Sequence, residues 1–384
     1  MRRLLRFSIR LLLVLILCAA ALGLWKREEI SRLLAVNSLF DAGKIVQNFS
    51  HMDQLFLHRS LSRGQGPVAE LTPGPYAALS PDAQQWVKDR AVTGLVILHH
   101  GQLVHESYYL GTAPQDLRIS WSVAKSFLSA LFGILHSEGM IPSLDDPVEK
   151  YAPLLKGSAY EGVSVHDILT MSSGVAFNED YLDFNSDINR MGRVLALGGS
   201  MDEFAASLKH RASAPGSQWH YVSIDTHVLG MVMRGATGKD IPELMETRLL
   251  APLGLEAAPY YLTDSAGISF VLGGLNLRTR DYARFGQMVL QDGQWQGQQV
   301  VPADWIKLST SPQAKDGTAY GYQWWIPPQA SRGEVMAQGV YGQYIYINPS
   351  MSVVIAVNAA DRDFEAEGVN DANIAMLRKI AAGL

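Results

Sequence analysis

The sequence predicts an α+β domain in which both ends of the domain contribute strands to one antiparallel sheet, with a helical lobe inserted between them. Segments with the pattern of β-strands lie far apart, at 94–109 and 320–359. From 121 to about 255 the apolar residues mostly follow helical spacing. We therefore expect a domain over 84–384 with its helical lobe at about 121–264.

The composition excludes several classes of protein. The chain has 384 residues, of which 48% are hydrophobic and 18% charged, the balance of a globular protein. A net charge of −5 provides no basic surface, so no nucleic-acid partner is expected. The one cysteine, Cys18, cannot form an internal disulfide. The histidine spacing matches no zinc motif, so no metal is predicted, and no cofactor either.

The first 25 residues have the pattern of a signal anchor or a signal peptide. An apolar run, "LLLVLILCAAALGLW", follows four arginines, Arg2, Arg3, Arg6 and Arg10. Cleavage after the small residues 19–21 would release a periplasmic protein, whereas retention would leave it anchored in the inner membrane. About 15 apolar residues are few for a ~30 Å hydrocarbon core unless residues 7–9 extend the run. In both cases the body of the protein is expected to be exported.

Residues 26–83 are predicted to be an N-terminal extension or linker. The segment starts with helical spacing and continues as a Gly- and Pro-rich loop, "RSLSRGQGPVAELTPGPY". The domain then opens with two β-rich runs, Gly94–His99 and Leu103–Tyr109, on either side of His100-Gly101. This pattern predicts a β-hairpin.

Several later elements follow from periodicity and capping residues. Helices are expected from the N-cap Ser164 to Gly174, over 223–238 and 281–293, and at the C-terminus over 367–384. Three adjacent antiparallel strands are expected at 320–327, 341–349 and 351–359, with turns at Pro327 and Asn348-Pro349.

The stretch "ISWSVAKSFLSALFGIL" places Ser122 and Lys125 on one face of the first turn of a helix. Serine at a helix start is commonly only a cap, and a nearby lysine is commonly solvated. The apolar residues that follow indicate a buried helix, however, and burial disfavours the charged form of a lysine. A neutral lysine beside a serine hydroxyl is a general base beside a nucleophile.

Two further stretches follow at intervals of about a hundred residues. Tyr221 and Ser223 precede the helix in "QWHYVSIDTHVLG", and Gly339 and Gly342 border a strand in "VMAQGVYGQYIYINP". Alone, the tyrosine could be core and the glycines turn residues. In this order with Ser122 and Lys125, however, the motifs resemble the serine β-lactamase and penicillin-binding-protein superfamily. The resemblance covers roughly 84–380 and is closest to the class C-like esterases and 6-aminohexanoate-oligomer hydrolases.

The resemblance implies a β-lactamase/transpeptidase-like fold and a set of site residues. The implied nucleophile is Ser122, with Lys125 and Tyr221 as general base and acid. The implied oxyanion donors are the backbone N–H groups of Ser122 and Val340. The implied substrate-binding residues are Tyr181, Ser223, Gln338 and Gly339.

The departures from the superfamily pattern favour particular substrates. Ser223 stands where asparagine is commonest, and Ala337 replaces a lysine that helps hold the carboxylate of β-lactams and D-alanyl peptides. Losing that charge-assisted bond favours an ester or a linear amide without the carboxylate. An acidic loop with Glu179, Asp180 and Asp183 could favour a substrate with a cationic end, or could be only a solvated loop.

Three functions remain open on the sequence. The first is a serine hydrolase that cleaves a small ester or linear amide through an acyl-enzyme on Ser122. The second is a β-lactamase or D-alanyl peptidase of the same fold. The third is a non-catalytic, membrane-tethered binding module, against which the joint presence of Ser122, Lys125 and Tyr221 argues.

Overall fold

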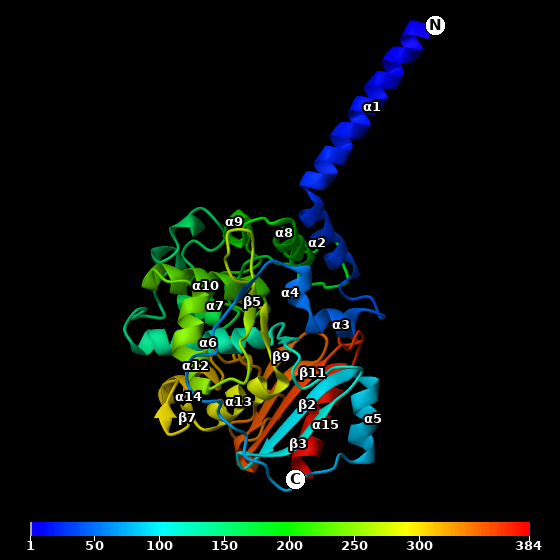
Figure 1. The fold of residues 1–384 in the computed structure, drawn as a ribbon. Helices are drawn as coiled ribbons and strands as arrows, with labels where there is room; N and C mark the ends of the chain where they lie inside the picture. Colours follow the sequence, from blue (N-terminus) through cyan, green and yellow to red (C-terminus); the bar gives the residue numbers. More distant parts are fainter. Residues whose placement is uncertain (1) are drawn as a thin grey trace.

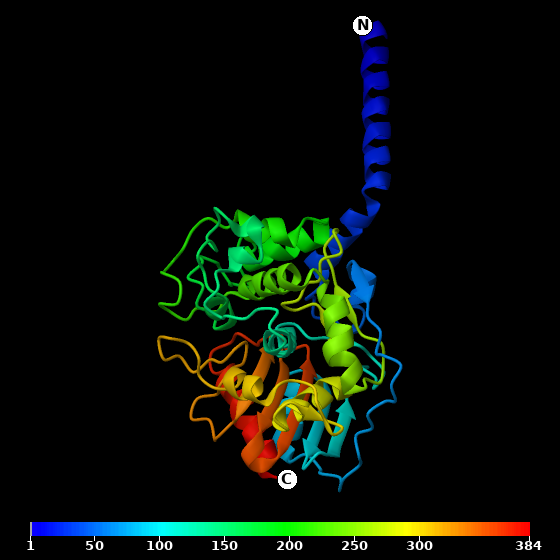
Figure 2. The ribbon, with the colours of Figure 1, turned by 90° about the vertical axis from the view of Figure 1, so that its left-hand side faces the viewer.

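The computed structural model describes residues 2–384 and contains a five-stranded antiparallel sheet with a helical lobe on one side (Figures 1 and 2). The strand order is β3-β2-β11-β10-β9. The strands are β2 (Val92–His99), β3 (Gln102–Tyr108), β9 (Val335–Gly339), β10 (Gln343–Asn348) and β11 (Val353–Ala359). Because β2 pairs with β11, the two ends of the domain meet in the middle of the sheet. The predicted α+β architecture is confirmed.

The β2–β3 hairpin forms where the sequence predicts it. His100 and Gly101 both have positive φ, 49° and 75°, as a tight two-residue hairpin loop requires. Every residue of β2 except the last is buried, because helices cover both faces of the sheet. On one face lie α5 (Pro81–Asp89) and α15 (Val369–Ala382), and on the other α13 (Thr279–Leu290).

Helices α6 to α12 and a small second sheet make up most of the lobe. The helices are α6 (Val123–Ser137), α7 (Val165–Leu169), α8 (Asp187–Leu197), α9 (Met201–Ser207), α10 (Ser223–Thr237), α11 (Ile241–Met245) and α12 (Ala251–Leu253), with a π-turn at Glu246–Leu250 and 3₁₀ turns at Val148–Lys150 and Pro153–Leu155. The small sheet has the order β1-β5-β6-β4, with β1 (His58–Ser60), β4 (Arg118–Ile119), β5 (Tyr260–Leu262) and β6 (Leu275–Leu277). The remaining elements are β7 (Gln294–Trp295), β8 (Gln298–Gln299), α14 (Ala303–Ser309) and a 3₁₀ turn at Pro349–Met351.

Two expected elements differ from the structure. Residues 320–327 form no sheet strand, since Gln323 adopts a positive φ of 64° that breaks an extended run, and β9 takes the third strand position instead. The helix that starts at the Ser164 capping box ends at Leu169 rather than near Gly174. Its last carbonyls, of Ile168 and Leu169, accept hydrogen bonds from the buried Gln323 amide, which replaces a further helical turn.

Much of the segment before the domain packs into the same core. Its elements are α2 (Arg27–Ser38), α3 (Ile45–Ser50), α4 (Met52–Leu55) and β1. Phe49 and Met52 are fully buried, and β1 pairs with β5 of the lobe. The ring of Phe40 stacks on Tyr341 with the centroids 4.6 Å apart, which joins this segment to the turn after β9.

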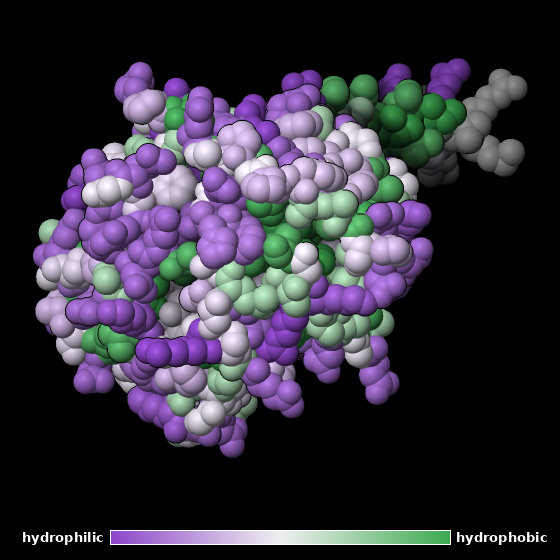
Figure 3. All heavy atoms as spheres, turned by 90° about the horizontal axis from the view of Figure 1, so that it is seen from below, coloured by the Kyte–Doolittle hydropathy of each residue, from purple (hydrophilic) through white to green (hydrophobic). Residues whose placement is uncertain are grey.

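Helix α1 (Arg2–Trp25) projects from the body (Figure 1). Its stretch Arg6–Trp25 is long and apolar enough to cross a membrane, and none of it is buried against the rest of the chain. The space-filling view shows it as an apolar column beyond a body surface on which hydrophilic residues predominate (Figure 3).

Candidate active site

Ser122 lies at the point where α6 begins, next to a sharp turn of the backbone. Trp121, the preceding residue, has a φ of 42°, which is an unusual conformation for a bulky side chain. Ser122 occupies the N-cap position, but its hydroxyl makes no capping bond to the helix. The hydroxyl is therefore available for another partner, and backbone strain of this kind gathers at functional sites.

Lys125 lies one turn further along α6 and points back to Ser122. Its Nζ is 2.9 Å from Ser122 Oγ and 2.9 Å from the carbonyl oxygen of Leu272. The residue is only 2% exposed. Burial lowers the pKa of the amine to about 7, although the carboxyl groups of Glu179 and Asp225 act in the opposite direction. A substantial share of Lys125 is therefore neutral at neutral pH.

Tyr221 stands beside this pair, just before α10. The Lys125 Nζ lies 5.4 Å from the centroid of its ring. On the other side the ring of Trp325 packs 5.3 Å away. Burial, reinforced by the carboxylate of Glu179, raises the pKa of Tyr221, while the neighbouring Ser122 hydroxyl opposes that rise. The phenol therefore keeps its proton at neutral pH.

The sequence analysis named Glu179 only as part of an acidic loop, yet its carboxylate belongs to the interior of the site. It accepts hydrogen bonds from the backbone N–H and the hydroxyl of Ser223 and from the hydroxyl of Tyr181. Burial raises its pKa, and the bonds from Ser223 and the amine of Lys125 oppose this. Only the joint presence of "FNEDY" and the serine at 223 could have pointed to this contact.

A second carboxyl group, of Asp225, lies on α10 behind the site and was not singled out from the sequence. It is fully buried and accepts a hydrogen bond of 2.7 Å from the hydroxyl of Tyr160. Burial raises its pKa to about 8. Asp225 is therefore mostly protonated at neutral pH and places little negative charge near Lys125.

The end of strand β9 runs against the backbone of Ser122. A Cβ added at Gly339 would lie 2.9 Å from the carbonyl oxygen of Ser120 and 3.1 Å from the nitrogen of Ser122. Only glycine fits such an approach without a shift. Across residues 2–384, neither the N–H of Ser122 nor that of Val340 donates a hydrogen bond within the protein. Both donors are thus free for a negatively charged oxygen.

Of the other residues expected from the resemblance, some line a cavity at Ser122 and one does not. Tyr181, Ser223 and Val340 line a cavity that also contains Ser122. Gln338 does not line it. The side chain of Gln338 lies on the opposite face of β9 from Gly339, where its amide contacts the sulfur of Met336 at 3.8 Å. A substrate contact by Gln338 therefore stays a prediction.

The acidic loop is held together by its own carboxylates. Asp180 accepts hydrogen bonds from the backbone N–H groups of Leu182 and Asp183. Asp183 accepts one from the N–H of Asn185. Since Glu179 is bonded to Ser223 and Tyr181, all three carboxylates have partners inside the protein. These bonds fix the loop, but Asp180 and Asp183 stay exposed and keep their charge, so attraction of a cationic substrate stays a prediction.

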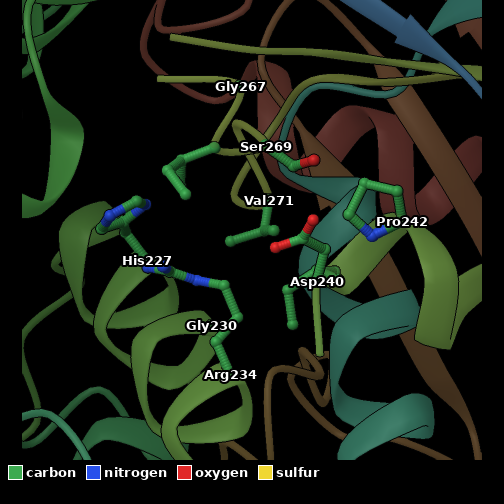
Figure 4. Close-up of a pocket in the computed structure, with 10 residues that line it drawn as sticks. His227, Gly230, Arg234, Asp240, Pro242, Gly267, Ser269 and Val271 are labelled. Atoms are coloured by element: carbon green, nitrogen blue, oxygen red, sulfur yellow. The ribbon is translucent and has the colours of Figure 1, made fainter. Parts of the chain in front are cut away.

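The cavity beside Ser122 has a volume of about 110 Å³. Its walls come from α2, α4, α8, the segment 262–273 and the turn after β9. A second hollow lies beside α10 and contains His227, Arg234 and Asp240 (Figure 4). That hollow measures about 10 Å³, which is room for a water at most. Among the described residues no cluster of side chains has the composition of a metal site.

The arrangement combines the groups that acyl transfer requires. Ser122 supplies a hydroxyl, and Lys125 supplies an amine that is partly neutral and within hydrogen-bond reach. Two free backbone N–H groups lie next to them. Tyr221 supplies a proton that is not lost at neutral pH.

Comparisons with known proteins agree with this arrangement. The family model described as Beta-lactamase matches residues 83–377. The 6-aminohexanoate-dimer hydrolase of Paenarthrobacter ureafaciens is 29% identical over 292 residues, which cover 72% of this chain and 74% of that protein.

Solved structures support the same fold. A Bacillus anthracis protein, provisionally assigned as a 6-aminohexanoate-dimer hydrolase, aligns with a TM-score of 0.78 at 24% identity, over 89% of this chain and 95% of that one. The octameric penicillin-binding protein homologue of Pyrococcus abyssi aligns with a TM-score of 0.57 at 21% identity, over 78% and 77%. These matches confirm the resemblance to the serine β-lactamase and penicillin-binding-protein superfamily. The chain belongs to the beta-lactamase family and is a serine hydrolase of that family.

Proposed function

We propose that the protein cleaves an ester or a linear amide through an acyl-enzyme on Ser122. The proposal depends on one observation. The amine of Lys125 lies 2.9 Å from Ser122 Oγ, and this lysine is only 2% exposed. A lysine with a pKa of about 7 can accept the hydroxyl proton near neutral pH, which an ordinary lysine cannot.

In the proposed reaction Ser122 Oγ attacks the carbonyl carbon while its proton passes to Lys125 Nζ. The carbonyl oxygen becomes an oxyanion, and the N–H groups of Ser122 and Val340 hold it. The bond to the leaving group then breaks, and Tyr221 gives its proton to the departing alkoxide or amine. Lys125 returns its proton to Tyr221, and water hydrolyses the acyl-enzyme to restore Ser122.

We favour esters and linear amides as substrates over β-lactams and D-alanyl peptides. Ala337 is fully buried in β9 and offers no charge to a substrate carboxylate. The Paenarthrobacter relative is named for hydrolysis of the 6-aminohexanoate dimer, whose units are joined by an amide bond. A non-catalytic binding module would not need a lysine buried against a serine.

Replacing Ser122 by alanine should abolish turnover, by about a thousandfold or more, because the nucleophile is lost. The fold should tolerate the change, since the hydroxyl makes no capping bond. Intact-mass measurement after reaction with a fluorophosphonate probe should show one adduct on the wild type and none on Ser122→Ala. Ser129→Ala, a change on the same helix, is the matched control and should still be labelled. Turnover by Ser122→Ala within tenfold of the wild type would refute the assignment.

The rate should depend on pH through Lys125. The amine acts as a base only when neutral, so kcat/KM should rise about tenfold per unit below pH 7 and level off above about pH 8. Lys125→Arg should be nearly inactive, because arginine keeps its proton. The surface variant Lys156→Arg should reproduce the wild-type profile. If kcat/KM reached half of its plateau only near pH 10, or if Lys125→Arg were active, Lys125 would not be the base.

Because no lysine stands at position 337, the protein should hydrolyse β-lactams less efficiently than short esters or linear amides. A charge-assisted hydrogen bond contributes about 1.5–3 kcal/mol, so its loss corresponds to about ten- to a hundredfold in affinity. We expect kcat/KM for a chromogenic cephalosporin to fall at least tenfold below that for the best short ester or linear amide. Equal efficiency for both substrates would contradict the argument from Ala337.

We also propose that α1 stays attached and anchors an exported body to the cytoplasmic membrane. Its apolar side chains are exposed along the whole span, and such a surface needs a bilayer or removal. The protein should remain in the membrane fraction after carbonate extraction. Leu12→Arg with Leu15→Arg should release it, because each charge near the centre of a span costs about 3 kcal/mol. A mature chain that begins just after Ala21 would mean that the segment is a cleaved signal peptide.

A further inference from the structure

The cavity at Ser122 has a chemical character that the proposed reaction alone does not explain. Its polar wall groups are few, and most are already bonded to the protein. The hydroxyls of Ser223 and Tyr181 donate to Glu179. The amide of Asn189 donates to the carbonyl oxygens of Tyr181 and Asp183. What remains facing the cavity is largely hydrocarbon.

The apolar wall comes mainly from outside the catalytic motifs. Val36 and Phe40 belong to α2 and its C-terminal continuation, and Met52 belongs to α4. Ile188 and Met191 belong to α8, which packs against α2. The cavity therefore extends from the nucleophile into the junction between the lobe and the segment that follows α1.

The position of the cavity relative to the catalytic groups indicates which part of a substrate it holds. Ser122 and Val340, which face the carbonyl group, line the cavity, whereas Tyr221 does not. Tyr221 protonates the leaving group and stands against Trp325 instead. The group that enters the cavity is therefore the one on the other side of the carbonyl carbon, the acyl chain.

Exposed apolar side chains lie on two of the segments that contribute to the cavity wall. Leu182 is 84% exposed and Phe184 63% exposed in the loop that follows Tyr181. On α2, Leu34 is 62% exposed, two residues before the wall residue Val36. Val36 lies eleven residues beyond Trp25, the end of the apolar helix, and only Lys26 separates that helix from α2.

From these observations we infer that the substrate is an ester or amide of a medium-chain fatty acid, with its alkyl chain bound between Ser122 and helices α2 and α8. This inference rests on the proposed acyl-enzyme. It specifies the acyl group, while the leaving group stays by Tyr221 and Trp325. The placement of the wall beside α1 suits a chain that the enzyme takes from a lipid environment.

Gly192, on α8, offers a way to fill the cavity. It lines the cavity, has no positive φ, and a Cβ added there would meet no atom within 4 Å. Gly192→Phe should therefore fit and occupy space that an alkyl chain would use. Leu197→Phe is the matched control, because it adds a ring to the same helix at an exposed position that does not line the cavity. Val36→Phe fills the cavity from α2 and serves as the second variant if Gly192→Phe does not fold.

The experiment compares the full chain and these variants in phosphatidylcholine vesicles, with p-nitrophenyl acetate, butyrate, hexanoate and octanoate. Burial of a methylene corresponds to about a fourfold gain, so kcat/KM should rise at least thirtyfold from acetate to octanoate in the wild type and in Leu197→Phe. In Gly192→Phe or Val36→Phe the octanoate-to-acetate ratio should fall at least tenfold. Comparing variants in the same vesicles cancels the partitioning of the esters into lipid.

Three results would overturn the inference. One is a flat dependence of kcat/KM on chain length in the wild type. Another is the same dependence in the filled variants as in Leu197→Phe. The third is a kcat/KM that rises with the length of the alcohol group instead of the acyl group, so that octyl acetate is preferred to ethyl octanoate. In each case, detection of an acetyl adduct on Ser122 by intact-mass measurement would still support the proposed acyl-enzyme mechanism. Absence of an adduct on Ser122 from any ester would refute the proposed function itself.

Discussion

The site depends on the burial of one amine. Lys125 sits on a helix whose residues from Val123 to Leu135 are all buried, so its charge has no access to water. Its hydrogen bonds go to a hydroxyl and a backbone carbonyl, not to a carboxylate. Burial therefore outweighs the opposing charge of Glu179, while Asp225 is mostly protonated and adds little charge. The same burial that makes α6 central thus lets its lysine lose its proton near neutral pH, as the proposed role of a base requires.

The sheet supplies the second constraint, because it brings a distant strand to the start of α6. Pairing of β2 with β11 closes the domain, and β10 then carries β9 to the sheet edge beside Ser122. Gly339 permits the contact with the Ser120–Ser122 backbone. Phe40 stacks on Tyr341 and braces the turn that contains Val340. The placement of the two proposed oxyanion donors therefore depends on contacts from three separate parts of the chain.

The sequence predicted what local pattern and motif order can encode. The hairpin around His100-Gly101, the helix ending at Gly238 and the meeting of both domain ends in one sheet were all predictable from periodicity and turn residues. The inward turn of Glu179 was not, because a carboxylate in an acidic loop looks solvated until its partners are known. The strand expected at 320–327 was wrong because Gln323 serves a long-range contact with α7, which no local pattern reports.

The segment between α1 and the family domain is part of the folded body and of the cavity wall. Residues 26–83 looked like a linker because of their glycines and prolines, yet Phe49 and Met52 are as buried as the core of the lobe. A spacer would need no such packing, since exposed, flexible chain suffices to hold a domain away from a membrane. Because α2 and α4 instead form a wall of the cavity at Ser122, the proposed substrate-binding surface continues beyond the family domain toward the apolar helix. The chemistry thus belongs to the family fold, whereas the apolar cavity depends on the segment that joins this fold to α1.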